Sequence, residues 1–473
     1  MVARGSVRQF GPAVAGRCRG FLRLILSQLV LCNGALLLTD EQVTPGAMPT
    51  RAQRIIEQAR ALGINPTLEN FKRFCDGIDS PQERYSCVQV GGTNGKSSTA
   101  RYLAAILQQH GLGVGLYTSP ELVRLNERIE IRGQVITDDD LERSLSTLAS
   151  QAKKWDIQLS EFELFSAVAL TEFAVHAVDY AVLEVGLGGR WDATSVVLPR
   201  LAILTGVDFD HTQILGSTIK EIARDKAAII KPGTTVVLAD TRPEALDIFQ
   251  DRARAVGATV VLATEELGNV ALPSPARLFA SYQRANQSTA LTAARALLKS
   301  DFVLDVAQNA LRDTVIPGRF ETVCEQPLVI IDAAHNPQAL AVLMTALVDA
   351  GLLPPFSASD ASFRTPPILL LALLADKDAE AILAALEPYE IEVAVTQTAS
   401  PRALGADALA SIVASRLGYA PLTFATSAEA LDALIPHGRP IIACGSITLA
   451  GEVKRRFAPA RHSDKMSQTD NNR

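Results

Sequence analysis

The sequence predicts an α/β protein with mostly parallel sheets, and three observations lead to that class. Short apolar runs recur along the chain, for example at residues 180–183 and 201–204. Each run is followed by Gly or Asp and then by a stretch with helical character. The runs are apolar throughout rather than alternating, which is typical of strands covered by helices on both faces.

Two series of apolar runs divide the chain. The first comprises residues 87–90, 180–183, 201–204 and 235–238, and the second comprises 328–331, 368–374, 391–395 and 441–443. Pro317 and Gly318 separate them, and a chain of 473 residues is too long for one ordinary core. We therefore expect an unassigned extension (1–47), a central domain (48–314), a linker (315–321), a smaller C-terminal α/β domain (322–457) and a polar tail (458–473).

Composition argues against several classes of function. Hydrophobic residues make up 48% of the chain and charged residues 20%, which is a normal globular profile. The net charge of −6 argues against binding to a nucleic-acid phosphate backbone. The 6 cysteines include no CxxC pair, which fits reduced thiols in a cytoplasmic enzyme better than disulfides or a zinc site.

The first 47 residues differ from the rest, because they are rich in arginine and contain no acidic residue before Asp40. A leucine-rich stretch at 21–38 is interrupted by polar residues at positions 23, 27, 28 and 33, so it is a poor membrane span. It also lacks the clean apolar run and exit site of a secretory signal. We expect an ill-defined extension and no membrane partner.

The strongest chemical signal is the segment 91–98, Gly-Gly-Thr-Asn-Gly-Lys-Ser-Ser, which follows a strand and opens a helix. Glycines let backbone N–H groups surround a phosphate, and a helix N-terminus adds a favourable field. Lys96 adds a positive charge, and the hydroxyl of Ser97 can reach a magnesium ion. Val90 stands where the general phosphate-loop pattern has its first glycine. A plain glycine turn is the alternative, and Lys-Ser at the helix start argues against it.

A second signal is Glu184, at the end of a predicted buried strand and followed by the glycine-rich segment 186–189. A buried carboxylate needs a partner. A metal ion beside the phosphate loop is one candidate, and an ion pair with Arg190 is the other. The sequence alone leaves both open.

A third signal, Asp-Phe-Asp-His at 208–211, follows the strand at 201–204. Strand ends in open parallel sheets face the ligand crevice, so His211 is expected at the same edge as Lys96 and Glu184. Lys226 follows in a largely apolar segment. It belongs either to this site or to an exposed pair with Asp225.

In order and spacing, these segments resemble the folylpolyglutamate synthase and dihydrofolate synthase family, the folate branch of the Mur ligases. The resemblance runs from about residue 48 to about residue 457. It implies a Mur-ligase-like phosphate-loop domain followed by a smaller Rossmann-like α/β domain. Further markers are Thr-Ser-Pro (118–120), Asn-Glu-Arg-Ile (126–129), Asp-Ala-Thr (192–194), Pro-Gly-Arg-Phe (317–320), Asp-Ala-Ala-His-Asn-Pro (332–337), Asp-Lys-Asp (376–378) and Gly-Ser (445–446).

The resemblance implies a role for individual residues. The phosphates of ATP would be held by Gly92, Thr93, Asn94, Gly95, Lys96 and Ser97, with further nucleotide contacts from Asn286, Arg319 and Asp332. Magnesium ligands would be Ser119, Glu184 and His211. Lys226 matches a lysine that becomes carbamylated and helps to hold a second magnesium ion, so Lys96, His211 and Lys226 carry the catalytic roles.

The substrate positions follow in the same way. His335 and Ser446 match contacts to the incoming glutamate. Ser160, Phe162 and Asp192 match positions that contact dihydropteroate in bifunctional members, although plain core packing explains Phe162 equally well.

The implied activity is an ATP- and magnesium-dependent ligation of L-glutamate to dihydropteroate, to reduced folates or to both, through an acyl phosphate. The expected partners are these small molecules alone, and the expected state is a monomer. Departures from the family pattern, such as Glu121 for His and Asn70 for Arg, lie on the acceptor side. The alternatives are another Mur-type amino-acid ligase and an ATP-binding relative without catalysis.

Overall fold

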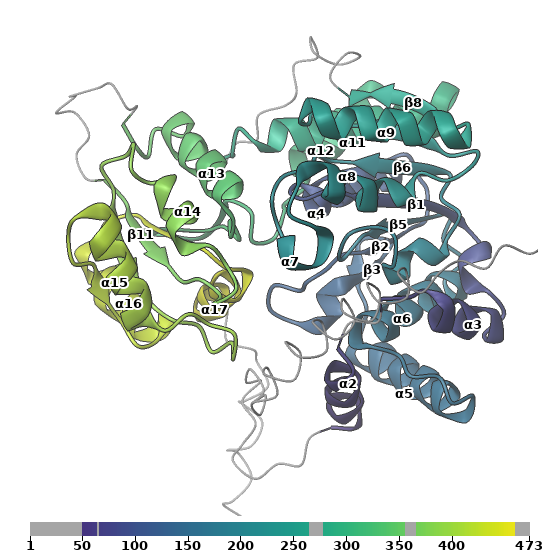
Figure 1. Ribbon diagram of the computed structural model, residues 1–473, viewed down its shortest axis with the longest axis horizontal. Coiled ribbons are helices and arrows are strands. Elements are labelled where there is room, and N and C mark those ends of the chain that lie inside the picture. Colours follow the sequence, from purple (N-terminus) through teal and green to yellow (C-terminus); the bar gives the residue numbers. More distant parts are fainter. Residues whose placement is uncertain (1–49, 64–65, 264–277, 355–365, 459–473) are drawn as a thin grey trace, which may run out of the picture. The chain divides into compact units, whose positions relative to one another are not determined.

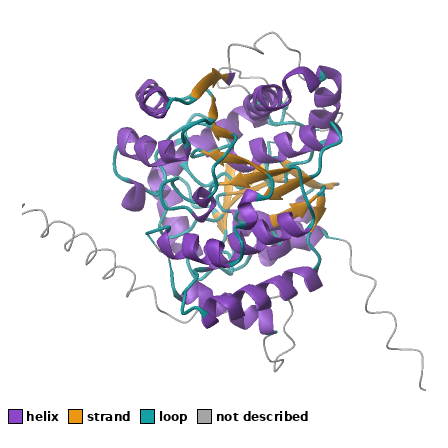
Figure 2. Cartoon of the chain, turned by 90° about the vertical axis from the view of Figure 1, so that its right-hand side faces the viewer, coloured by secondary structure: helices purple, strands orange, loops and turns teal. Residues whose placement is uncertain are grey.

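The computed structural model describes residues 50–63, 66–263, 278–354 and 366–458. The expectations for residues 1–47 and for the tail after residue 458 lie outside the described residues. Within these ranges the chain forms two sheets flanked by helices (Figure 1, Figure 2). The predicted α/β class is therefore confirmed.

The larger sheet has the strand order β4-β3-β2-β5-β1-β6-β7-β8. The strands from β2 to β8 in this order pair in parallel, and β3 and β4 add an antiparallel edge. The strand bounds are β1 (Ser86–Gly91), β2 (Val114–Tyr117), β3 (Ile129–Ile131), β4 (Gln134–Val135), β5 (Tyr180–Glu184), β6 (Leu201–Leu204), β7 (Thr235–Leu238) and β8 (Thr259–Leu262).

Helices cover both faces of the larger sheet, because successive strand residues point to opposite faces and both sets are apolar. One face packs against α4, α11 and α12, and the other against α3, α5 and α6 over one half and α8 and α9 over the other half. The helix bounds are α2 (Arg51–Ala61), α3 (Glu69–Gly77), α4 (Lys96–Gln109), α5 (Asp138–Lys154), α6 (Glu161–Val175), α7 (Thr212–Leu215), α8 (Ile219–Lys226), α9 (Pro243–Val256), α11 (Gln283–Leu298) and α12 (Leu304–Asp313).

The helix that was predicted after the glycine-rich segment is α4. Four apolar residues at helical spacing are all buried against the sheet and α11, namely Ala100, Leu103, Ala104 and Leu107. The helix ends at Gln109, and Gly111 follows it with φ +84°, a conformation that glycine adopts without strain.

The smaller sheet has the order β13-β12-β11-β14-β10-β9, with β9 antiparallel and the other strands parallel. Helices α13, α14 and α15 cover one face, and α16 and α17 cover the other. The bounds are β9 (Glu321–Glu325), β10 (Leu328–Ile331), α13 (Pro337–Asp349), β11 (Ile368–Leu371), α14 (Ala379–Ala384), β12 (Glu392–Val395), α15 (Ala406–Leu417), β13 (Leu422–Thr423), α16 (Ser427–Leu434), β14 (Ile441–Cys444) and α17 (Ile447–Phe457).

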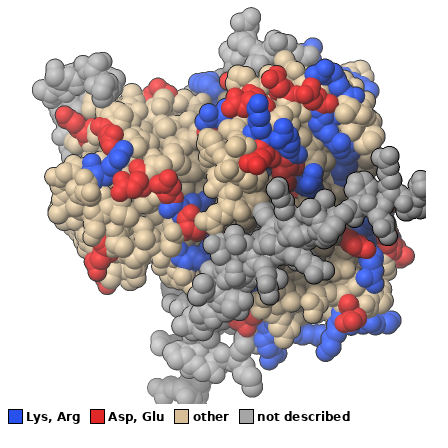
Figure 3. Space-filling view, in the orientation of Figure 1, with Lys and Arg blue, Asp and Glu red and all other residues tan. Residues whose placement is uncertain are grey.

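Every predicted apolar run forms a strand, although the run at 368–374 ends as a strand at Leu371. Six strands were not predicted from the sequence, namely β2, β3, β4, β8, β9 and β13. These strands have only 2–5 residues, and several lie at sheet edges, where a long apolar run is not required. In the described part of the chain, no helix is long and apolar enough to cross a membrane. On the face shown in Figure 3, basic and acidic side chains are intermingled.

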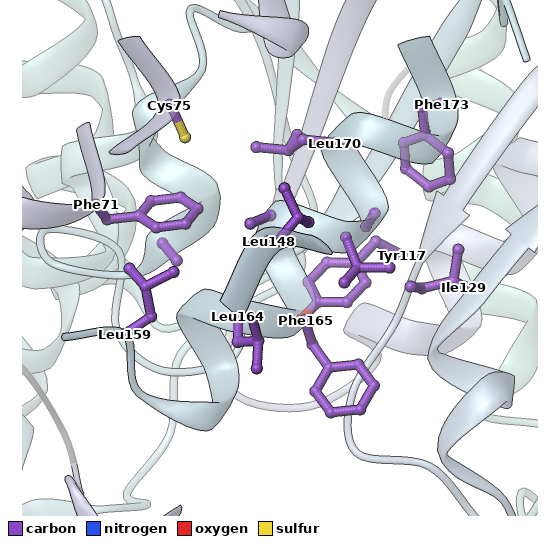
Figure 4. Packing of buried hydrophobic residues seen from close by; sticks show 14 of the residues in the cluster. Phe71, Cys75, Tyr117, Ile129, Leu148, Leu159, Leu164, Phe165, Leu170 and Phe173 are labelled. Carbon is purple, nitrogen blue, oxygen red and sulfur yellow. The ribbon is translucent and has the colours of Figure 1, made fainter. Parts of the chain in front are cut away.

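The apolar cluster beneath α5 and α6 gives the larger sheet much of its buried surface (Figure 4). Phe173, at the end of α6, is fully buried, and its ring lies edge-on to Tyr85 at 6.2 Å between centroids. The ring also covers Gly115 of β2, where an added Cβ would lie 2.4 Å from the Phe173 Cδ1 atom. A small residue in β2 thus makes room for a large one in α6.

We expect Phe173→Ala to lower the free energy of unfolding by about 3 to 5 kcal/mol, because it removes a buried ring and leaves a cavity. Val175, two residues further on, is 67% exposed, so Val175→Ala serves as the control and should change that free energy by less than about 0.5 kcal/mol. Urea titration followed by tryptophan fluorescence measures both. Equal effects of the two substitutions would contradict this account of the core.

Candidate active site

A cleft of about 580 Å³ lies at the carboxyl ends of the central parallel strands. The segments after β1, β5 and β6 contribute to its wall, as expected for an open parallel sheet. The segment after β10 lines it from the smaller sheet. Of the predicted site residues, those that line the cleft are residues 92–97, Ser119, Glu184, His211, Lys226, Asn286, Arg319, Asp332 and His335.

The glycine-rich segment forms a tight loop between β1 and α4. Gly92 has φ +143°, and an added Cβ would lie 2.0 Å from the Thr205 Oγ1 atom. Gly95 has φ +83°, and an added Cβ would lie 2.4 Å from the Asn286 Oδ1 atom. Both positions therefore need glycine for conformation and for space. The loop therefore packs directly against Thr205 and Asn286, and the start of α4 lines the cleft.

Glu184 joins three loops at the base of the cleft. Its Oε1 atom accepts a hydrogen bond of 2.7 Å from the Ser97 hydroxyl, and its Oε2 atom accepts one of 3.2 Å from the Ser119 N–H. Burial raises the pKa of Glu184 and lowers the pKa of Lys96, because each charge lies out of water, and their mutual attraction opposes both shifts. The carboxylate therefore has a hydroxyl and a backbone N–H as partners, and the predicted alternative of an ion pair with Arg190 is wrong.

Lys226 is buried, so the alternative of an exposed lysine paired with Asp225 is also wrong. Its Nζ atom donates a hydrogen bond of 2.7 Å to the Gly92 carbonyl oxygen, directly below the phosphate loop. Burial, followed by the nearby charge of Lys96, lowers the pKa of Lys226 from 10.5 to about 7. A substantial fraction of this amine is therefore neutral near neutral pH.

Asp210 connects the segment after β6 to the smaller sheet. Its carboxylate lies 2.8 Å from the Lys377 Nζ atom and 3.4 Å from the His335 Nε2 atom. The hydrogen bonds and charges of these partners hold the pKa of Asp210 well below its ordinary value, against the opposing effect of burial. His211 follows directly; its side chain is 42% exposed, and the partial withdrawal of its imidazole from water lowers its pKa to about 4. At neutral pH its imidazole is uncharged, which is the form that binds a metal.

Asp332 is buried at the end of β10 and is held by three donors. Its carboxylate accepts hydrogen bonds of 2.6 Å from the Tyr282 hydroxyl, 2.8 Å from the Phe320 N–H and 2.8 Å from the Ala334 N–H. Arg319, the residue before Phe320, lines the same cleft. Tyr282 and Arg319, which precede the smaller sheet in sequence, thus line the site together with Asp332 at the end of β10.

The four remaining predicted residues do not line the cleft and have local structural partners. Ser160 caps α6 in a capping box with Glu163, and Ser446 caps α17. The Asp192 carboxylate accepts hydrogen bonds from the N–H groups of residues 186, 187 and 194. Phe162 packs against Gly186, a residue of the cleft wall, so Phe162 and Asp192 lie directly behind that wall.

A charged network that was not predicted from the sequence lies behind the loop that contains Ser119. Arg128 is buried, and its guanidinium contacts Glu121 at 2.5 Å and Glu161 at 3.1 Å. Arg60 of α2 contacts the same Glu161 at 2.7 Å. Glu121 was noted only as a departure from the family pattern, and Arg128 now accounts for its charge. Glu161 lies 33 residues from Arg128 and 101 from Arg60, which is why spacing alone could not reveal the network.

Comparisons with known proteins agree with this fold. Residues 90–266 match the Mur ligase middle domain family, which defines the class as a Mur-type ligase. The dihydrofolate synthase/folylpolyglutamate synthase of Bacillus subtilis (strain 168) is 34% identical over 310 residues, which covers 59% of this chain and 71% of that protein. The chain therefore belongs to the dihydrofolate synthase/folylpolyglutamate synthase family, and the resemblance inferred from the sequence is confirmed.

Solved structures give the same result. The folylpolyglutamate synthase of Mycobacterium tuberculosis complexed with ADP and AMPPCP is 29% identical, with a TM-score of 0.76, and the match covers 86% of this chain and 99% of that one. A bifunctional folylpolyglutamate synthase/dihydrofolate synthase with Mn, AMPPNP and L-glutamate bound is also 29% identical, with a TM-score of 0.71 and coverage of 84% and 95%.

The lowered pKa of Lys226 predicts how stability depends on pH. Between about pH 7 and pH 10.5 the unfolded chain keeps a proton on this amine that the folded chain has lost, so the free energy of unfolding rises with pH in this window. Relative to Lys226→Met, the wild type should gain about 1 kcal/mol per pH unit. Lys220→Met, on the exposed side of the same helix, is the control.

Chemical denaturation from pH 7.5 to pH 9.5, in buffer free of metal and bicarbonate, measures this difference. Parallel profiles for the wild type and Lys226→Met would mean that the buried amine stays charged, which contradicts the prediction.

Proposed function

We propose that this protein is an ATP- and divalent-metal-dependent ligase that joins L-glutamate to the carboxyl group of a pteroate or folate through an acyl phosphate. One observation carries the proposal: the phosphate loop, the Glu184 carboxylate with its serine partners, and Asp332 all line one cleft. Family membership supports the same activity.

The reaction requires little covalent chemistry from the protein. A carboxylate is a poor electrophile, so transfer of the γ-phosphate of ATP activates it as an acyl phosphate. The amine of glutamate then attacks the acyl carbon, and phosphate leaves. The residues of the cleft position the reactants and offset negative charge, with Lys96 and the start of α4 beside the phosphates.

The donor set fits a hard divalent cation such as magnesium. The Ser97 hydroxyl and the Glu184 carboxylate meet at one point, and Ser119, whose N–H contacts the same carboxylate, lines the cleft beside them. Magnesium prefers such oxygen ligands together with phosphate oxygens and waters. Among the described residues, no group of three or more His, Cys, Asp or Glu side chains gathers at one point. A bound metal would offset charge on the phosphates, and His211 would be a further ligand.

We propose in addition that Lys226 is carbamylated and helps to hold a second metal ion. Its amine lies buried under the phosphate loop, where a positive charge would repel a metal. Addition of CO₂ to the neutral amine, with loss of one proton, forms a carbamate and converts the side chain into an anionic oxygen ligand.

The acceptor is either dihydropteroate, a reduced folate or both, and a bifunctional enzyme is the version we propose. Phe162 and Asp192, behind the cleft wall, would then contact the pterin, and His335 and Ser446 would contact glutamate. These contacts need some local rearrangement, since the Asp192 and Ser446 side chains are occupied by backbone donors. No partner beyond these small molecules is required, and one chain supplies the whole cleft.

Phosphate release by the purified protein with ATP, magnesium and glutamate tests the function. We expect release that depends on glutamate with dihydropteroate in one reaction and with tetrahydrofolate in another. Lys96→Ala should lower the rate on the order of 100-fold or more, because the phosphate charge loses its ammonium partner. Release with a UDP-linked acceptor alone, or ATP binding without any release, would contradict the proposal.

The carbamate has a separate test. Lys226→Ala should lose activity by about 100-fold or more, and a short carboxylate such as propionate should restore part of it by supplying the missing anionic oxygens. Full activity of Lys226→Ala, with no effect of added carboxylate, would show that no carbamate is needed. Lys220→Ala in the same assay controls for loss of a positive charge on α8.

A further inference from the structure

The loop that follows β2 extends from the proposed metal site into the core of the smaller sheet. Its first part includes Ser119, whose N–H contacts Glu184. Three residues further on, Leu122 is buried in the apolar cluster between the smaller sheet and helices α16 and α17. The other buried members of this cluster, within the described residues, all come from residues 329–453.

The loop is shaped by a side chain of its own segment before it reaches that cluster. The Glu127 Oε2 atom accepts hydrogen bonds of 2.9 Å from the Leu122 N–H and 3.0 Å from the Val123 N–H. Leu122 therefore sits on a backbone turn that is already fixed, and a displacement of its side chain or carbonyl is transmitted towards Ser119.

Gly451 of α17 meets this loop backbone to backbone. A Cβ at position 451 would lie 2.0 Å from the Leu122 carbonyl oxygen and 3.1 Å from its carbonyl carbon. Neither atom is the movable end of a side chain. Any residue other than glycine at position 451 must therefore push the loop and the helix apart.

The linker between the two sheets meets the same leucine. A Cβ at Gly318 would lie 3.0 Å from the Leu122 Cδ1 atom. The Gly318 N–H donates a hydrogen bond of 2.8 Å to the Glu321 carboxylate. The same carboxylate accepts a hydrogen bond of 2.8 Å from the Lys454 Nζ atom of α17. Leu122 thus lies where the metal-site loop, the linker before Arg319 and α17 come together.

Helix α17 begins at its cap Ser446, the residue proposed to contact glutamate, and runs for 11 residues. The start of this helix therefore lies at the proposed glutamate contact, and its second turn, at Gly451, touches the loop that contains Ser119. A helix is stiff over this length, so the contact holds the loop that contains Ser119 at a fixed distance from Ser446.

We propose that Leu122 and Gly451 are positioning residues of the ligase, whose contact sets the distance between the acyl phosphate at the metal site and the glutamate amine. The inference rests on the proposed function, because it concerns the step in which these two groups react. Neither residue touches a reactant. Their effect is exerted through Ser119 on one side and Ser446 on the other.

Gly451→Ala and Leu122→Ala test the inference in the glutamate-dependent phosphate-release assay. Each should lower kcat by about 10- to 100-fold and raise the magnesium concentration needed for half-maximal rate, because displacements near 1 Å have effects of this size on oriented reactions. Leu122→Met keeps the side-chain volume and should restore most of the rate. Gly405→Ala, where the nearest atom to the new Cβ is 3.7 Å away, is the matched control in the smaller sheet's part of the chain.

The double variant Leu122→Ala/Gly451→Ala separates positioning from general stability. Because both changes act on one contact, their effects on kcat should be non-additive, with the double variant close to the more damaged single one. A lowered melting temperature with unchanged kcat and unchanged magnesium dependence would overturn the inference, since a purely structural contact behaves in that way. If Gly451→Ala fails to fold, Leu122→Ala and Leu122→Met decide the question alone.

Wild-type protein that releases no phosphate with either acceptor would overturn the proposed function, and this inference with it. Active wild-type protein, combined with kcat values within twofold for Leu122→Ala and Gly451→Ala, would overturn the inference alone. The two failures are therefore distinguishable in one set of measurements.

Discussion

The site depends on one buried carboxylate, that of Glu184. It stands at the end of a central strand, where the low dielectric would make an isolated charge very costly. Its stabilisation comes from the Ser97 hydroxyl, the Ser119 N–H and the nearby ammonium of Lys96. Those partners belong to two other loops, so the buried carboxylate is compensated only where the loops after β1, β2 and β5 meet. The same requirement gathers the side chains that we propose as metal ligands.

A second constraint is that the larger sheet supplies only part of the cleft. Both polar and apolar contacts join the larger sheet's part of the chain to the smaller sheet's part. Asp210 pairs with Lys377, Asn94 donates a hydrogen bond of 2.6 Å to Gln338, and Leu122 is buried beside α17. Polar contacts lie at the cleft wall, and the apolar contact lies behind it. This division is physically reasonable, because polar groups near the reactants can exchange partners when ligands bind, whereas a packed core contact resists displacement.

For several residues the location in the cleft was predicted from the sequence, but their hydrogen-bond partners were not. Lys96, Glu184 and His211 were expected at one edge because strand ends in a parallel sheet gather there, and the structure places all three in the cleft together with Lys226. Their partners could not be predicted, because hydrogen bonds such as that of Lys226 to the Gly92 carbonyl join residues 134 positions apart. The acceptor side was the least predictable, since Asp192 is surrounded by donors of its own loop.

By itself, the sequence determined the α/β class, the phosphate loop and the family, because these depend on local patterns: apolar runs, glycines at fixed offsets and a lysine at a helix start. Tertiary structure alone decided that Glu184 pairs with serines rather than with Arg190, that Lys226 is buried, and that Gly451 has to be glycine. Each of these facts depends on an atom from a distant segment, and only folding determines which distant segments meet.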